Sequence, residues 1–192
     1  GNNLPKTTGR VAGLMKEKNE LIGMGELEGL DLLRHFASGQ LVDTPIRIRL
    51  FMTLLMQYRC AIREIETKLN VLNEEFSLEH ERNPIEMIES RVKEPVSIVE
   101  KMNRKGYELS VESIEAHLND VAGVRVICSF VEDIYYLASM LSAQDDLEVV
   151  KVKDYIKHPK KNGYRSLHMI IQIPIFLSSE KKYMRVEVQF RT

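Results

Sequence analysis

The sequence predicts an α+β (α/β) domain with a mixed β-sheet flanked by helices, preceded by a helical extension. Three observations support this. A helical hydrophobic period runs through residues 46–75, a β-branched apolar run opens at Val121, and that run is the first of four predicted strands. Because a helix separates the first two strands and a short connection separates the last two, we expect a βαβ-type start followed by a hairpin.

Residues 46–75 are predicted to form one long helix, and residues 1–45 before it an irregular segment with a short helix over Leu30–Phe36. Asp43-Thr44-Pro45 is a plausible start for the long helix. Its apolar stripe cannot be buried by the helix alone, so the helix must pack on the domain or on a second subunit. The stripe consists of Ile48, Phe51, Leu54, Leu55, Tyr58, Ile62, Ile65, Leu69 and Leu72.

Three shorter helices are predicted between the long helix and the sheet. A restart at Pro84 suggests a short helix over Ile85–Ser90. Pro95 suits the first position of the next helix. Ser110 is the expected N-cap of the third, with Glu112 in its first turn.

The second half of the chain alternates between strand and helix patterns. Strong β-branched runs are separated by turn residues, and Ser178–Lys182 is expected to connect the last two strands as a hairpin. The predicted elements are strands over 121–130, 147–153, 167–175 and 183–191, with a helix over 131–143 between the first two.

The composition is that of an ordinary globular protein and excludes several classes. Hydrophobic residues make up 44% and charged residues 29% of the chain, and no apolar run approaches the roughly 20 residues that span a bilayer. We therefore expect a cytoplasmic protein with no membrane partner. Cys60 and Cys128 stand in apolar surroundings, far apart in the sequence, and are expected to be buried thiols in a reducing compartment. No Cys/His spacing suits zinc.

The charge is unevenly distributed, although the formal net charge is only −1. Residues 151–165 hold six Lys and Arg residues against the single Asp154. This local cluster would attract an anion, whereas the near-neutral chain as a whole gives no long-range attraction to nucleic acid.

The last predicted strand separates polar from apolar residues with period 2. If its polar face coincides with those of the preceding strands, His168, Gln172, Lys151 and Lys153 join it. A carboxylate such as Glu187 amid these cations would stay ionised and could bind Mg²⁺ or accept a proton. The polar set of the last strand is Arg185, Glu187, Gln189 and Arg191.

Two cationic segments could hold phosphate. In residues 160–165, an Asn-Gly turn stands beside two lysines, and Tyr164 offers a flat face for a base. Near the predicted start of the helix at Pro95, Arg91 and Lys93 precede Ser97 and Lys101, which are four residues apart on one helical face. Taken singly, each segment is more often a solvated turn or an exposed helix.

Asp120 stands at the mouth of the first strand, where an acid is well placed to bind a metal. A strict pleat would put Asp120 and Arg125 on opposite faces of the sheet. A bulge at Gly123, or a strand that starts after Gly123, would allow both side chains to lie on the same face of the sheet, and both alternatives remain open.

Four ordered motifs run through residues 91–192: R91-V-K-x-x-x-S-I-x-x-K101, D120-V-A-G-V-R-V-I127, K153-D-Y-I-x-x-P-K-x-N-G-Y-R-S-L-H168 and V186-E-V-Q-F-R-T192. Together they resemble the synthetase domain of the RelA/SpoT family, over about residues 46–192. The resemblance implies a nucleotidyltransferase-like fold, and no His-Asp dipeptide of the family's hydrolase domain is present, which favours the small alarmone synthetases. The family's C-terminal helices are expected to be absent from residues 1–192.

The activity that the resemblance implies is that of a GTP pyrophosphokinase of the stringent response. Such enzymes move the β,γ-diphosphate of ATP to the 3′-hydroxyl of GTP or GDP, with Mg²⁺ as cofactor, and form (p)ppGpp and AMP. Asp120 and Glu187 would hold the metal, and Glu187 would also act on the 3′-hydroxyl as base or orienting group. ATP would be held by Arg91 and Arg125 at adenine and by Lys93, Ser97 and Lys101 at the phosphates.

The acceptor nucleotide would lie against the β-strands and the loop between the second and third of them. Tyr164 would stack on guanine, and a group of polar residues would line the rest of the pocket. The resemblance also implies a homotetramer with an effector cleft, with an alarmone effector or single-stranded RNA as further partners. The acceptor set is Lys153, Lys161, Asn162, Tyr164, His168, Gln189 and Arg191.

Two other readings are open. One is a non-catalytic regulator that keeps the pocket and binds a nucleotide or RNA; the net charge and the lack of an exposed aromatic ladder argue against RNA as its main ligand. The other is a nucleotidyltransferase that moves a nucleotide and releases pyrophosphate, whereas diphosphate transfer releases AMP.

Overall fold

A computed structural model describes residues 44–192. The segment predicted to be irregular, with its helix over Leu30–Phe36, lies outside the described residues except for residues 44 and 45. The described chain divides into two compact units: residues 44–56 with 94–117, and residues 57–93 with 118–192.

The predicted long helix is confirmed as α3, Thr44–His80, which runs five residues beyond the predicted end. All nine residues of the predicted apolar stripe are buried, including Phe51 and Ile65 with no exposed surface. The first part of α3 belongs to one unit and the part from Gln57 onward to the other.

The first unit also holds α4, Pro95–Lys105, and α5, Val111–His117, as predicted. Pro95 stands at the start of α4, where its missing N–H costs no helical hydrogen bond. The hydroxyl oxygen of Ser110 accepts a hydrogen bond from the backbone N–H of Ser113 at 3.1 Å, which confirms Ser110 as the N-cap of α5.

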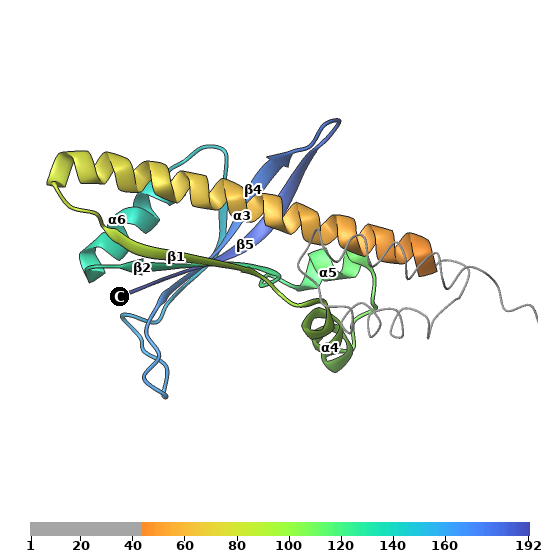
Figure 1. The fold of residues 1–192 in the computed structure, drawn as a ribbon. Coiled ribbons are helices and arrows are strands. Elements are labelled where there is room, and N and C mark those ends of the chain that lie inside the picture. The colour runs from red at the N-terminus through yellow and green to blue at the C-terminus, as the bar shows by residue number, and fades with distance from the viewer. Residues whose placement is uncertain (1–43) are drawn as a thin grey trace, which may run out of the picture. The chain divides into compact units, whose positions relative to one another are not determined.

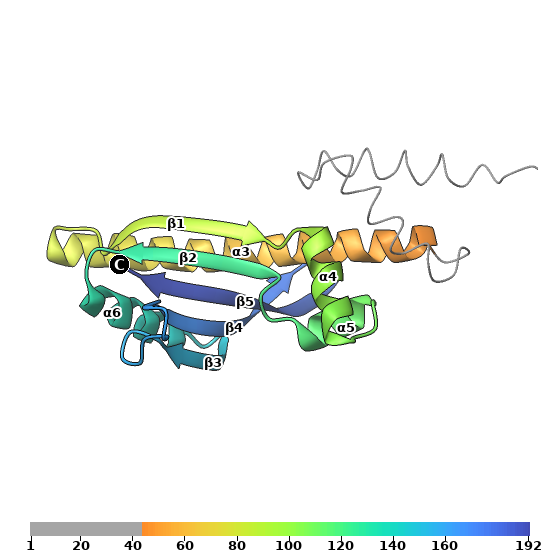
Figure 2. The same cartoon turned by 90° about the horizontal axis from the view of Figure 1, so that it is seen from below.

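The second unit is built on a five-stranded mixed sheet in the order β1-β2-β5-β4-β3, seen side by side in Figure 2. β2 and β5 pair in parallel, and the other neighbours pair antiparallel. The strands are β1 Ile85–Val92, β2 Ala122–Cys128, β3 Glu148–Asp154, β4 Leu167–Phe176 and β5 Lys181–Arg191.

The helix predicted over Ile85–Ser90 is wrong, because these residues form the edge strand β1. The segment is too short for a helical and an alternating period to be told apart, and its Glu and Met residues favour a helix locally. Antiparallel pairing with β2, from Ile85 opposite Cys128 to Val92 opposite Ala122, overrides that preference.

The predicted βαβ start and terminal hairpin are both confirmed. α6, Val131–Ser142, connects β2 to β3, and the pairing directions make β3 parallel to β2 with β5 and β4 between them. β4 and β5 pair from Leu167 opposite Phe190 to Phe176 opposite Lys181, so the hairpin turn is shorter than predicted.

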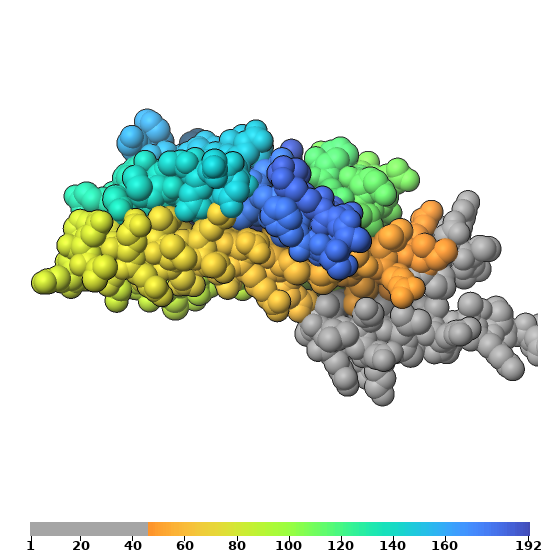
Figure 3. Space-filling view, turned by 90° about the horizontal axis from the view of Figure 1, so that it is seen from above, coloured from red at the N-terminus to blue at the C-terminus, as the bar shows by residue number. Residues whose placement is uncertain are grey.

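Within the second unit, α6 and the later part of α3 cover one face of the sheet (Figure 1). Figure 3, seen from that side, shows the later part of α3 (yellow) next to α6 (teal). The apolar sides of the strands lie beneath them, and the other face of the sheet carries no helix of this unit. The core includes Ile65, Leu69, Val126, Ile134, Leu137, Leu141, Ile171, Val186, Val188 and Phe190.

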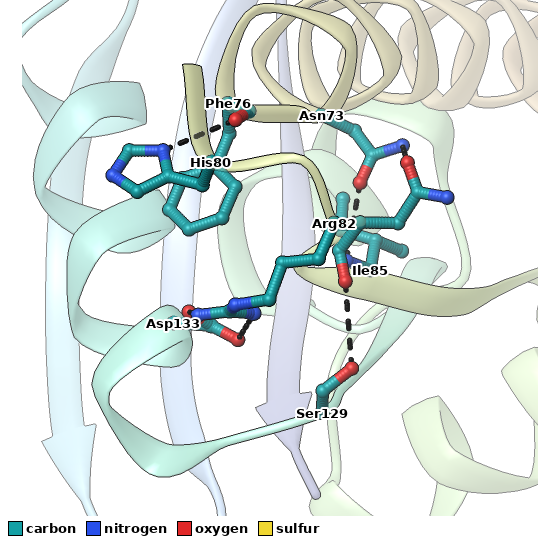
Figure 4. Close-up of polar contacts among 8 residues, drawn as sticks. Asn73, Phe76, His80, Arg82, Ile85, Ser129 and Asp133 are labelled. Carbon is teal, nitrogen blue, oxygen red and sulfur yellow. Dashed lines mark hydrogen bonds and ion pairs between the residues drawn. The ribbon is translucent and has the colours of Figure 1, made fainter. Parts of the chain in front are cut away.

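A cluster around Arg82 fixes the turn between α3 and β1 (Figure 4). Arg82 donates two hydrogen bonds to the buried carboxylate of Asp133 on α6, at 2.7 and 2.8 Å. The guanidinium carbon also lies 5.0 Å from the ring centres of Phe76 and Phe130. Because a buried carboxylate needs such a partner, this pair joins the end of α3 to the start of α6.

Cys128 is buried, which raises the pKa of its thiol to about 12, whereas Cys60 is only half-buried and corrects the expectation of two buried thiols. No helix within residues 44–192 is long and apolar enough to cross a bilayer.

The packing of α6 on the sheet can be tested with a core truncation. Leu137→Ala should lower the free energy of unfolding by about 2–5 kcal/mol, because Leu137 is fully buried and its loss leaves a cavity. Met140→Ala on the same helix should change it by less than about 0.5 kcal/mol, because Met140 is 37% exposed. Chemical denaturation measures both, and equal losses would contradict the packing described.

Candidate functional site

The uncovered face of the sheet carries the polar residues predicted for the site. β5 confirms the predicted alternation: Met184, Val186, Val188 and Phe190 are at most 1% exposed, while the intervening residues are partly exposed. The apolar side packs under the helices, so the polar side must face outward.

The strand register places these polar residues in two rows across the sheet. One row runs from Arg91 through Gly123 to Glu187. The next places Arg125 beside Gln189, Gln189 beside His168, and His168 beside Lys153. The expectation that the polar faces of the last three strands coincide is confirmed at these positions.

A cleft of about 430 Å³ opens over the first row and the strand ends beside it. It combines cations, carboxylates and an open backbone position at Gly123, the mix that a polyphosphate nucleotide with a metal ion requires. Its lining residues are Glu89, Ser90, Arg91, Lys93, Asp120, Gly123, Val124, Arg125, Glu187 and Gln189.

Asp120 and Arg125 both line this cleft, and neither of the two alternatives proposed from the sequence explains it. β2 begins at Ala122, before Gly123, and pairs regularly through Gly123 without a bulge. Asp120 precedes the strand, so the pleat does not determine its direction. Its carboxylate forms an ion pair with the Lys93 ammonium at 2.9 Å, and the Lys93 N–H donates to the Val121 carbonyl at 2.7 Å.

Glu187 lies at the centre of a polar network on β5. Its Oε1 lies 2.8 Å from the His168 Nε2 and accepts a hydrogen bond from the Gln189 amide at 2.6 Å. Burial raises the pKa of the Glu187 carboxyl and repulsion from Asp120 adds to this, but the hydrogen bonds from His168 and Gln189 and the attraction of His168 outweigh both. The net pKa is below its ordinary value, so Glu187 is a carboxylate at neutral pH.

The loop between β3 and β4 brings Tyr164 to this network. The Tyr164 hydroxyl donates to the Gln189 Oε1 at 3.1 Å, and the Arg191 guanidinium carbon lies 5.9 Å from the Tyr164 ring centre. The Asn162 side chain accepts a hydrogen bond from the Tyr164 N–H at 3.1 Å, and Gly163 has a φ of 83°, so the predicted Asn-Gly turn is present.

The roles of Ser97, Lys101 and Lys161 stay predictions. Ser97 and Lys101 share one face of α4 in the other unit, so their role at the ATP phosphates stays a prediction. Lys161 lies on the exposed part of the β3–β4 loop, and its role also stays a prediction.

Sequence reasoning missed three residues of the site region, Glu89, Ser90 and Tyr155. Glu89 and Ser90 line the cleft, but reading Ile85–Ser90 as a helix hid the fact that Glu89 and Arg91 share a face of a strand. Lys160 places its ammonium 4.7 Å from the Tyr155 ring centre and 5.1 Å from that of Tyr164. Lys160 is one of the two lysines predicted to hold phosphate, whereas the turn signals of the loop gave no indication that Tyr155 packs against it.

The lowered pKa of Glu187 predicts a pH-dependent contribution to stability. Because the folded-state pKa is below the ordinary value of 4.5, the ionised carboxylate stabilises the fold fully above about pH 4.5. That stabilisation is lost as the pH falls through the folded-state pKa. Glu187→Gln should therefore be less stable than the wild type at pH 7, by a difference that shrinks toward pH 3.

Chemical denaturation between pH 7 and pH 3 measures this difference. Glu180→Gln is the matched control, because Glu180 is exposed in the turn between β4 and β5. A difference between wild type and Glu187→Gln that stays constant across this range would contradict the lowered pKa.

The sequence matches a family model and several known proteins. Residues 90–192 match the family model described as "Region found in RelA / SpoT proteins". The chain is 47% identical over 138 residues to GTP pyrophosphokinase YwaC and 40% identical over 138 residues to GTP pyrophosphokinase YjbM, both of Bacillus subtilis. Each match covers 72% of this chain, and the chain spans 66% and 64% of these relatives, slightly less than two thirds.

Solved structures of small alarmone synthetases share the fold of this chain. The small alarmone synthetase 1 of Bacillus subtilis, bound to its product pppGpp, superposes with a TM-score of 0.67 at 39% identity over 74% of this chain and 72% of that one. The small alarmone synthetase 2 of the same organism gives a TM-score of 0.66 at 44% identity, with the same coverage. The match of the family model over more than half of the chain shows that it belongs to the RelA/SpoT family.

Proposed function

We propose that the protein is a GTP pyrophosphokinase of the small alarmone synthetase type, which transfers the β,γ-diphosphate of ATP to the 3′-hydroxyl of GTP or GDP. The observation that carries the proposal is the ionised Glu187 in a cleft with Asp120 and the flanking cations. The names of the relatives and the pppGpp bound to one structural neighbour support it.

The donor nucleotide is assigned to the side of the cleft next to β1. Arg91 and Arg125 stand on adjacent strands in neighbouring rows, and Gly123 between them contributes no side chain. This leaves room for a flat purine between two guanidinium groups, which stack well on aromatic rings. Lys93 lies at the same cleft and supplies a charge for the phosphates, with Ser97 and Lys101 as further proposed contacts.

The acceptor nucleotide is assigned to the side of the β3–β4 loop. Tyr164 offers its ring for stacking on guanine, and its hydroxyl is held by Gln189, which also contacts Glu187. An acceptor base on Tyr164 would therefore bring its ribose toward Glu187. The remaining proposed contacts are Lys153, Lys161, Asn162, His168 and Arg191.

The proposed reaction is an in-line displacement at the β-phosphorus of ATP. The acceptor O3′ forms the new bond to this phosphorus, the bond to the oxygen bridging the α- and β-phosphates breaks, and AMP leaves with the electron pair. Glu187 orients the 3′-hydroxyl by accepting its hydrogen bond and takes up the proton as the O3′ bond forms. His168 and Gln189 hold the carboxylate in position for this.

The residues present also fit Mg²⁺. Asp120 raises the pKa of Glu187 by repulsion, so the two carboxylates act on the same region, and Mg²⁺ prefers one or two carboxylates together with substrate phosphates. Within residues 44–192, no group of three or more His, Cys, Asp or Glu residues is arranged to hold a metal ion. Bound there, the metal would neutralise charge on the transferred diphosphate.

Several expectations about the protein's surroundings stay predictions. These are the homotetramer, the binding of an alarmone effector or single-stranded RNA, and the cytoplasmic location. Incubation with GTP and with GDP in separate reactions measures which of the two is the preferred acceptor.

Removal of the Glu187 charge should abolish most of the activity. Glu187→Gln should lower kcat by about 10²–10⁴-fold, the usual contribution of a positioned general base. Incubation with ATP, Mg²⁺ and GTP or GDP, followed by anion-exchange chromatography, measures AMP and the more anionic guanosine product.

Glu180→Gln serves as the control and should retain full activity, because the residue is exposed in the β4–β5 turn. Release of pyrophosphate in place of AMP would show nucleotidyl transfer and contradict the proposal. So would a Glu187→Gln variant as active as the wild type.

A further inference from the structure

The side chain of Asp154 ties together three parts of the chain at the end of β3. One of its carboxylate oxygens accepts hydrogen bonds from the backbone N–H groups of Ile156 and Lys157, both at 3.0 Å. The other accepts a hydrogen bond from the hydroxyl of Tyr135 on α6 at 2.7 Å. The Asp154 carbonyl also accepts from the N–H of His158 at 3.2 Å, which closes the turn.

This contact joins the helix-covered side of the sheet to the loop that bears Tyr164. α6 packs on the covered face, whereas the β3–β4 loop leaves the sheet on the side away from α3 (Figure 1). The Lys157 ammonium lies 5.3 Å from the Tyr135 ring centre and adds a second contact between the same turn and α6.

The turn held by Asp154 carries the first residue of an aromatic cluster. Tyr155 donates its backbone N–H to the Ser166 carbonyl at 2.9 Å, so the two ends of the loop are joined at its base. The Tyr155 ring centre lies 6.2 Å from that of Tyr164 at an interplanar angle of 66°, and 6.3 Å from that of His168. The position of Tyr155 therefore affects both residues that face the proposed acceptor.

At neutral pH the charge states of Tyr135 and Asp154 favour the hydrogen bond between them. Burial raises the pKa of the Asp154 carboxyl. The hydrogen bonds from Lys157, Tyr135 and Ile156 and the attraction of Lys157 lower this pKa by more than burial raises it, so the net shift is downward. Burial, the hydrogen bond to Asp154 and its negative charge raise the pKa of Tyr135 to about 12. At neutral pH the pair is a hydroxyl donating to a carboxylate, a charge-assisted hydrogen bond.

We propose that Tyr135 and Asp154 are positioning residues for the acceptor nucleotide: their hydrogen bond holds the β3–β4 loop so that Tyr155 supports the Tyr164 ring for stacking. This inference rests on the proposed function, because it assigns guanine to Tyr164. Neither residue lines the donor cleft, and neither is assigned a direct contact with the nucleotide. Loss of the contact therefore weakens acceptor binding selectively and leaves the donor side intact.

The test uses Tyr135→Phe, which removes the hydroxyl and keeps the ring that packs with Lys157. Calorimetric titration of the 192-residue chain with GDP and, separately, with a non-hydrolysable ATP analogue measures both sites without turnover. The dissociation constant for GDP should rise about threefold to tenfold, because a hydrogen bond to a charged group is lost and only part of its energy reaches the loop. The constant for the ATP analogue should change less than twofold.

Tyr136→Phe is the matched control, since it makes the same chemical change one residue away on α6, and both constants should stay at the wild-type values. Asp154→Asn is the second variant and should weaken GDP binding at least as much as Tyr135→Phe. In steady-state assays, the KM for the guanine nucleotide should rise in both variants while kcat and the KM for ATP stay within twofold.

The outcomes separate this inference from the proposed function. Wild-type protein that binds GDP and releases AMP, together with a Tyr135→Phe variant of unchanged GDP affinity, overturns the inference and leaves the proposed function intact. Equal weakening of GDP and ATP-analogue binding, or a fall in thermal stability that accounts for both, also overturns it, because the pair would then be merely structural. Wild-type protein that binds no guanine nucleotide contradicts both.

Discussion

The site depends on the parallel pairing of β2 with β5. This pairing places Gly123 beside Glu187 and Arg125 beside Gln189, although the paired residues are 64 positions apart in the sequence. A slip of one residue in either strand would turn its polar side into the core. The register is held by apolar residues beneath the helices, such as Val126 and Val188, neither with any exposed surface. The packing of the covered face thus determines the geometry of the open face.

The two halves of the proposed reaction are supplied by opposite sides of this central pair. Toward β1, the open face presents Arg91 and Lys93 beside the carboxylate of Asp120. Toward β4, it presents His168 and the loop with Tyr164. Glu187 lies between the two groups, where a hydroxyl from one nucleotide could meet a phosphate from the other. The parallel pair β2–β5 therefore lies between the proposed donor side and the proposed acceptor side.

Much of the fold could be predicted because its signals are local. The stripe of α3, the N-cap at Ser110 and the alternation of β5 each follow from residues close together in the sequence. β1 could not be predicted, because its residues favour a helix and only the pairing with β2 makes them a strand. For the same reason the place of Glu89 in the cleft was missed. The motifs identified most of the candidate site, whereas the contact between Tyr135 and Asp154 depends on how α6 packs, which no local pattern records.

A crystal structure of the chain with both a non-hydrolysable ATP analogue and GDP would test the shared site most directly. We expect the adenine over Gly123 between Arg91 and Arg125, the guanine on Tyr164, and the acceptor 3′-hydroxyl within hydrogen-bond distance of Glu187. This arrangement would confirm that the β2–β5 register aligns donor and acceptor. Nucleotides bound away from this face of the sheet, or an acceptor ribose remote from Glu187, would contradict it.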